Sequence, residues 1–61
     1  MTIKCYIIED SSACAAALKR VENAVPCFTQ LELTADGYVE YTICCRLEDV
    51  VTVERMLARF V

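Results

Sequence analysis

The side chains with the greatest chemical potential in this sequence are its five cysteines, Cys5, Cys14, Cys27, Cys44 and Cys45. Thiolates bind soft metal ions, and they act as nucleophiles when a base lies nearby. The chain contains no histidine, so the usual partner of a nucleophilic cysteine is missing. An odd number of cysteines also differs from the even count typical of a secreted disulfide framework. We therefore predict free thiols in a reducing cytoplasm, serving mainly as small buried apolar side chains.

Two pairs of neighbouring carboxylates are the other groups that could transfer protons, Glu9 with Asp10 and Glu48 with Asp49. Each pair directly precedes a segment with helical character, where the positive end of the helix dipole favours negative charge. The single glycine leaves no phosphate-cradling loop. We interpret these carboxylates as helix-entry residues, and we predict a protein that is not an enzyme and carries no cofactor.

Charge and hydropathy narrow the classes of partner. The net charge is −3 and the six basic residues are scattered, which does not favour binding to a phosphate backbone but is compatible with a basic protein partner. Uncharged stretches such as Cys5 to Ile8 and Ser11 to Leu18 are too short to span a membrane. No secretory leader pattern opens the chain. We expect a cytoplasmic protein that binds neither nucleic acid nor membranes.

A hairpin from Phe28 to Leu47, turning at Asp36-Gly37, is predicted to organise the chain, because Asp-Gly suits the positive φ of a tight turn. Alternation along its arms separates two faces. The face predicted to join the core carries Leu31, Leu33, Val39, Tyr41, Ile43, Cys45 and Leu47. The opposite face carries Phe28, Gln30, Glu32, Thr34, Tyr38, Glu40, Thr42, Cys44 and Arg46.

Three further elements flank this hairpin. Residues Thr2 to Glu9 alternate as a strand, and we place Ile3, Cys5 and Ile7 toward the core and Thr2, Lys4, Tyr6 and Ile8 away from it. A helix should begin near Ser11 or Ser12, which are good N-cap residues, and end before Pro26. A second helix should run from about Asp49 to the C-terminus, with its apolar stripe at Val50, Val53, Met56, Leu57 and Phe60.

This order predicts one domain over residues 1–61 of the α+β class, a β-α-β-β-α split βαβ arrangement that is ferredoxin-like without the last strand. The antiparallel three-stranded sheet should carry both helices on one face. Right-handed connection places the first strand beside the second arm of the hairpin, with its outer edge open. A chain of this size buries only about 60% of its unfolded surface, so we expect an oligomer or a complex.

The sheet face without helices is the predicted partner surface. Under the phases given above it comprises Lys4, Tyr6, Ile8, Phe28, Glu32, Tyr38 and Glu40. Aromatic side chains on an open sheet can stack nucleic-acid bases, but the glutamates make protein the better partner. We predict a protein-interaction module, either a dimerising adaptor or an inhibitor docked on a larger protein, that binds through this face or through the edge of the first strand. As a variant of this hypothesis, a compact acidic domain without a catalytic set resembles the proteins that phages and mobile elements use against host enzymes.

A family resemblance begins in the stretch Ser11-Ser12-Ala13-Cys14-Ala15-Ala16-Ala17-Leu18 and continues to Val25-Pro26 and the alternating Leu31 and Leu33. Together these residues resemble the heavy-metal-associated domain family. In that family a C-x-x-C motif opens the first helix. Cys14 matches the second thiol, and Ser11 stands at the position of the first. The resemblance implies a ferredoxin-like fold and, as an alternative function, soft-metal carriage of Cu(I) with Cys14 as the ligand.

The topology and the expected edge-to-edge pairing also resemble ACT domains, with Glu9-Asp10-Ser11-Ser12 as the loop between the first strand and helix. This resemblance implies a small-ligand regulatory domain as a further alternative function. A second soft-metal arrangement would combine Cys5, Cys45 and Cys14, since the first two are predicted to share the core face. Cys44 should point outward and be the most exposed thiol.

Overall fold

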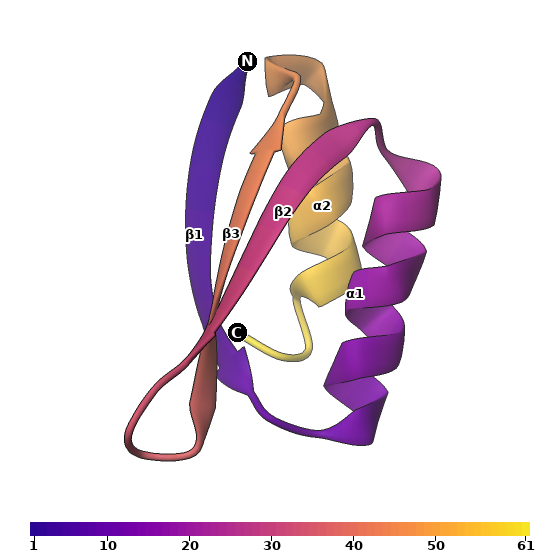
Figure 1. Ribbon diagram of the computed structural model, residues 1–61. Coiled ribbons are helices and arrows are strands. Elements are labelled where there is room, and N and C mark those ends of the chain that lie inside the picture. The colour runs from indigo at the N-terminus through magenta and orange to yellow at the C-terminus, as the bar shows by residue number, and fades with distance from the viewer.

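The computed structural model describes residues 1–61 and contains strands and helices in the predicted order. The elements are β1 (Thr2–Glu9), α1 (Ser12–Ala24), β2 (Cys27–Leu33), β3 (Tyr38–Cys45), a 3-10 turn (Leu47–Asp49) and α2 (Val50–Leu57). Figure 1 shows the sheet on one side of the molecule and both helices packed against its other side. The predicted α+β arrangement is confirmed. Neither helix has the length and apolar character needed to cross a membrane.

The sheet has the strand order β1-β3-β2, and both pairings are antiparallel. β3 therefore lies at the centre, while β1 and β2 form the two edges. No strand follows α2 within these residues, so the outer side of β1 has no strand beside it. The strand order and the open edge of β1 agree with the prediction.

The hairpin between β2 and β3 turns at Gly37, whose φ of 84° lies in the left-handed region that other residues rarely adopt. Thr34 closes the turn in two ways. Its backbone amide donates to the carbonyl of Tyr38 at 2.9 Å, and its hydroxyl lies 3.0 Å from the same oxygen. The Asp36-Gly37 turn predicted from the sequence is confirmed.

Helix α1 begins after Ser11, whose hydroxyl oxygen accepts a hydrogen bond from the amide of Cys14 at 3.2 Å. This side chain satisfies one of the amides that have no partner inside the helix. The helix ends at Ala24, since Val25 is extended before Pro26. Helix α2 ends at Leu57, earlier than predicted, and a short turn follows it.

The core lies between the sheet and the two helices. Its twelve buried residues are Ile8, Cys14, Ala17, Leu18, Val21, Val25, Val39, Tyr41, Ile43, Cys45, Val53 and Leu57. They come from β1, β3, both helices and the residue that follows α1, and none is charged. The four inward side chains of β3 are all buried, as predicted from their alternation. The hydroxyl of Tyr41 is the one buried side-chain polar atom that lacks a hydrogen-bond partner.

The phase predicted for β1 is wrong. Ile8 is only 1% exposed, whereas Ile3 and Ile7 are 70% and 53% exposed. The pairing with β3 places Lys4 opposite Ile43 and Tyr6 opposite Tyr41, both on the helix side. Both faces of β1 carry apolar side chains, so alternation alone does not decide which face turns inward. Cys5, also predicted to face the core, is exposed on the opposite side.

Three leucines predicted to lie in the core are also exposed. Leu31 and Leu33 share the face of their partners Tyr41 and Val39, but they are 55% and 73% exposed. β2 is an edge strand, and in Figure 1 its end leads into a hairpin turn that lies away from both helices, so the helices do not cover these side chains. Leu47 is exposed because the strand stops at Cys45 and Leu47 starts the 3-10 turn.

Candidate interaction surface

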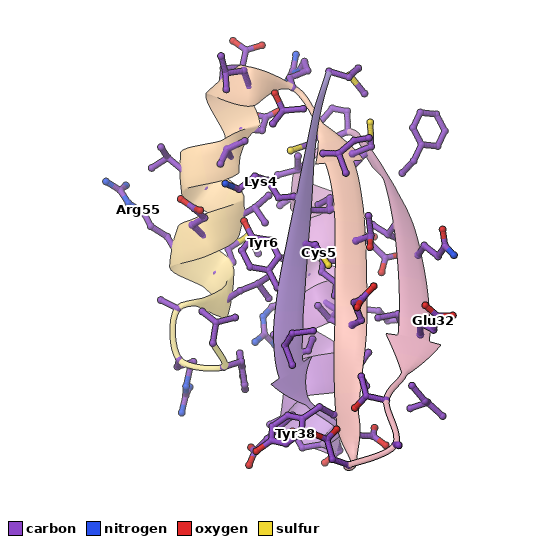
Figure 2. All side chains as sticks on the ribbon, turned by 90° about the vertical axis from the view of Figure 1, so that its left-hand side faces the viewer. Lys4, Cys5, Tyr6, Glu32, Tyr38 and Arg55 are labelled. Carbon is purple, nitrogen blue, oxygen red and sulfur yellow. The ribbon has the colours of Figure 1, made fainter.

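We call the sheet face that carries no helix the open face. Strand registers assign to it Ile3, Cys5 and Ile7 of β1, Phe28, Gln30 and Glu32 of β2, and Tyr38, Glu40, Thr42 and Cys44 of β3. Figure 2 views the molecule from this side, with Cys5, Glu32 and Tyr38 labelled. The face combines exposed apolar side chains with carboxylates. Such a mixture on a small domain is typical of a surface that contacts another protein.

The apolar part of the open face lies near the N-terminal end of β1. Ile3 and Phe28 flank Cys44, which pairs with both across the sheet. Phe28 is 76% exposed, so most of its ring is in contact with solvent. A shallow hollow of about 230 Å³ lies between these side chains, lined also by Thr29, Gln30 and Thr42. The hollow offers an apolar contact and no convergent set of charged groups.

The acidic part of the open face consists of Glu32 and Glu40, which lie directly opposite each other on β2 and β3. Like charges in this arrangement repel. Neither carboxylate takes part in an ion pair, since the ion pairs of the molecule join Lys4 to Glu54 and Arg46 to Glu48 and Asp49. The pair therefore adds a local negative charge to a surface that is otherwise largely apolar.

The backbone groups of β3 point alternately toward its two neighbours. In an antiparallel pair, opposed residues alternate between those that exchange backbone hydrogen bonds and those that do not. The amide of Thr34 donates to the carbonyl of Tyr38, which marks these two as a bonded pair. The even-numbered residues of β3 then bond to β2, and the odd-numbered residues, Val39, Tyr41, Ile43 and Cys45, bond to β1.

The outer edge of β1 follows from this alternation. Lys4, Tyr6 and Ile8 are the partners of Ile43, Tyr41 and Val39, so their backbone groups point toward β3. The N–H and C=O groups of Ile3, Cys5 and Ile7 consequently point away from the sheet. Their side chains lie on the open face. One short segment thus presents unpaired backbone donors and acceptors together with exposed apolar side chains.

The helix side of β1 is held by Glu54 of α2. The hydroxyl of Tyr6 donates to Oε2 of Glu54 at 3.5 Å, and Nζ of Lys4 lies 4.0 Å from the same oxygen. Figure 2 shows both side chains directed toward α2. Burial raises the pKa of Tyr6, and the charge of Glu54 raises it further. These contacts with Glu54 explain why the side chains of Lys4 and Tyr6 lie on the helix side of β1.

The predicted partner surface divides accordingly. The structure brings together Phe28, Glu32, Tyr38 and Glu40 on the open face, as predicted. Lys4, Tyr6 and Ile8 do not join them, because the phase of β1 is reversed. Ile3, Cys5 and Ile7 take their places. No signal within β1 identifies them, since the contacts with Glu54 that fix the phase arise only when α2 packs beside the strand.

The cysteines are free and occupy different environments. Cys14 is 1% exposed, and its pKa is raised by burial and then by the charges of Glu9 and Asp10. A neutral thiol inside the core is poorly placed to bind a metal ion from solvent. Ser11, at the position of the first thiol in the metal-binding motif, acts as the helix cap. Cys5 and Cys45 lie on opposite faces of the sheet, contrary to the prediction that they share one.

Two further observations bear on metal binding and on small-ligand binding. No group of three or more His, Cys, Asp or Glu side chains is close enough together to hold a metal ion. The hollow between the loop after β1 and α1, lined by Glu9, Asp10, Ser11 and Leu18 among others, measures about 70 Å³. That is room for about two water molecules, given a share of about 30 Å³ each, and is small for an amino-acid ligand.

Comparisons with known proteins give no relative for this chain. A scan against protein-family models found no match, and searches of curated proteins and of solved structures found no significant similarity.

Proposed function

We propose that this chain is a non-catalytic protein-interaction module that binds by adding a strand to β1, and that its partner is a second copy of itself. The observation that carries the proposal is the outer edge of β1. Its eight residues contain no proline, and Ile3, Cys5 and Ile7 present unpaired backbone groups beside exposed apolar side chains. An edge of this kind is a template for another strand.

A two-fold axis at Cys5 gives an antiparallel pairing of β1 with a second β1 over residues 2–8. Ile3 of each copy then lies opposite Ile7 of the other, and Cys5 lies opposite Cys5. All three have backbone groups directed outward, so the two strands can exchange hydrogen bonds at each of them. The result is a continuous six-stranded sheet, with the exposed isoleucines gathered at its centre on the open face.

Charge favours the register with its axis at Cys5 over the registers in which the axis is shifted along β1. Shifting the axis toward the N-terminus would place Lys4 opposite Lys4, which is destabilising. Shifting it toward the C-terminus would place Glu9 opposite Ile3. With the axis at Cys5, Lys4 lies opposite Tyr6, near the Glu54 carboxylate that both side chains already contact. The favoured register therefore pairs Lys4 with an acidic neighbourhood in the other copy.

Light scattering of the purified, reduced protein tests the proposal directly. We expect a mass near twice the chain mass of 6.9 kDa. Because each copy carries a net charge of −3, added salt should screen their repulsion and tighten the dimer. Docking on a basic protein would weaken with salt instead. A chelator should leave the mass unchanged, whereas a chelator-dependent mass would favour soft-metal carriage.

Two substitutions make the test specific to β1. Ile7→Lys places a charge in the proposed contact and should give a monomer. Leu33→Lys adds the same charge at another exposed site, on the β2 edge, and should leave the dimer intact. Mild oxidation should link Cys5 to Cys5 and yield a covalent dimer that Cys5→Ala abolishes. A monomeric wild-type protein, or equal effects of both lysines, would contradict the proposal.

A further inference from the structure

Two cysteines lie directly opposite each other at the end of the hairpin that is farthest from its turn. Cys27 begins β2, Cys45 ends β3, and the sheet register pairs them. Both side chains are on the helix side, because Cys45 belongs to the buried set of β3 and opposed residues share a face. The adjacent pair, Phe28 with Cys44, points to the open face. Cys27 and Cys45 are therefore the only cysteines opposed in the sheet.

The backbone geometry at this pair suits a covalent link. Cys45 directs its backbone groups toward β1, so Cys27 and Cys45 form a pair without mutual backbone hydrogen bonds. Opposed residues of that kind have Cα atoms about 4.5 Å apart, with their side chains close together. Disulfides require Cα separations of about 4.4–6.8 Å. The two thiols can thus be joined without rearranging the strands.

The two thiols differ in access to solvent. Cys27 is partly exposed at the start of the edge strand, whereas Cys45 is fully buried. Burial raises the pKa of both thiols, and the negative charge of Glu22 adds to the effect at Cys27. Both are accordingly protonated at neutral pH. An incoming reagent would meet Cys27 first, and Cys45 would be reached only from Cys27.

We propose that Cys27 and Cys45 form a reversible cross-strand disulfide by exchange with a low-molecular-weight disulfide. The Cys27 thiol loses its proton, and Sγ attacks one sulfur of the small disulfide, which breaks and releases one small thiol that takes up the proton. Sγ of Cys45 then loses its proton and attacks Sγ of Cys27. The bond to the remaining small thiol breaks, and that thiol leaves with the second proton. The protein dithiol is oxidised, and the small disulfide is reduced to two thiols.

Incubation of the Cys5→Ala chain with oxidised glutathione, followed by denaturation and alkylation, tests this assignment without the Cys5–Cys5 link proposed above. We expect the number of reactive thiols to fall from four to two, and the mass of the chain before alkylation to fall by two hydrogens. Cleavage after glutamate separates the relevant cysteines, since residues 23–32 contain Cys27 and residues 41–48 contain Cys44 and Cys45. The expected product is a disulfide between these two peptides, reversed by reduced glutathione.

Variants identify the two sulfurs and keep the test independent of folding. Cys27→Ala changes a partly exposed side chain and should stop disulfide formation with no loss of the folded state. Cys44→Ala should leave disulfide formation unchanged. Cys45→Ala should stop at the mixed disulfide of Cys27 with glutathione, which has a distinct mass. Three outcomes would overturn the proposal: oxidation that persists when Cys27→Ala is added, a link from residues 41–48 to the Cys14 peptide, or retention of all four thiols.

Discussion

The two faces of the sheet differ most clearly along β3 and least clearly along β1. On β3, apolar side chains turn toward the helices, while the open face carries Tyr38, Glu40, Thr42 and Cys44. On β1, the isoleucines Ile3 and Ile7 lie on one face and Ile8 on the other. The alternation of apolar and polar side chains is sufficient to determine which face of the central strand β3 turns toward the helices. The edge strand is oriented by packing against α2, and its second apolar face remains available for a partner.

Ile43→Ala should produce the largest loss of stability, because Ile43 is fully buried at the centre of the sheet. Removing a buried isoleucine side chain to alanine costs about 2–5 kcal/mol. The same truncation one residue earlier, Thr42→Ala on the open face, should cost about 0.5 kcal/mol or less. Urea unfolding of both variants measures the difference. Similar losses for the two would contradict the assignment of faces on β3.

Ile8→Ala tests the orientation of the edge strand. Ile8 is 1% exposed, so we expect a loss of about 2–4 kcal/mol in the free energy of unfolding. Ile7→Ala removes the same atoms from the open face and should cost less than about 1 kcal/mol in the monomer. The comparison uses dilute protein, where association contributes little. A larger loss of stability for Ile7→Ala than for Ile8→Ala would support the orientation predicted from the sequence, with Ile7 toward the core.

Alkaline pH should destabilise the helix-covered face in particular. Burial raises the pKa of Cys14, Cys27 and Cys45 above the ordinary value of 9.0. The folded state then holds protons that the unfolded chain releases, so stability is complete below about pH 9 and falls as pH rises through the folded-state pKa values. Each retained proton changes stability by about 1.4 kcal/mol per pH unit.

Urea midpoints measured between pH 7 and pH 10 would show this slope. Cys45→Ala removes one of the buried thiols and should make the slope shallower. A stability that is constant, or that rises, over this range would mean that the three thiols are hydrated in the folded state.

Tyr41→Phe should have the smallest effect, and in the opposite direction. The hydroxyl of Tyr41 is buried without a hydrogen-bond partner, and such a group costs free energy because it has lost its contacts with water. Removing it while keeping the ring should stabilise the domain by about 1 kcal/mol. Tyr38→Phe on the open face is the matched control, with little expected change. Thermal unfolding monitors both, and a lower melting temperature for Tyr41→Phe would indicate a partner for the hydroxyl.

Much of the fold could be predicted because its signals are local. The turn requires positive φ at Gly37, the cap requires a hydroxyl at Ser11, and Pro26 prevents helix α1 from continuing. The candidate surface was only partly predictable. The exposure of Leu31 and Leu33 depends on how far the helices extend over the twisted edge of the sheet, which their alternation does not encode.

The same limit applies to the residues of β1. The contacts of Lys4 and Tyr6 with Glu54 join opposite ends of the chain, so no local pattern could show that these side chains belong to the helix side. Four residues of the predicted surface were therefore placed correctly from hairpin alternation, and three were placed on the wrong face of a strand whose two sides are both apolar.

The central position of β3 also has a consequence for the order of folding. Its pairing with β2 joins residues that are close in sequence, whereas its pairing with β1 joins residues far apart along the chain. Closing the longer loop costs more chain entropy, so we expect the hairpin to form early and β1 to be added late. Of the three strands, β1 would then be the one whose backbone amides exchange with solvent most readily. A partner bound at its open edge would protect the strand that unfolds most easily from the sheet.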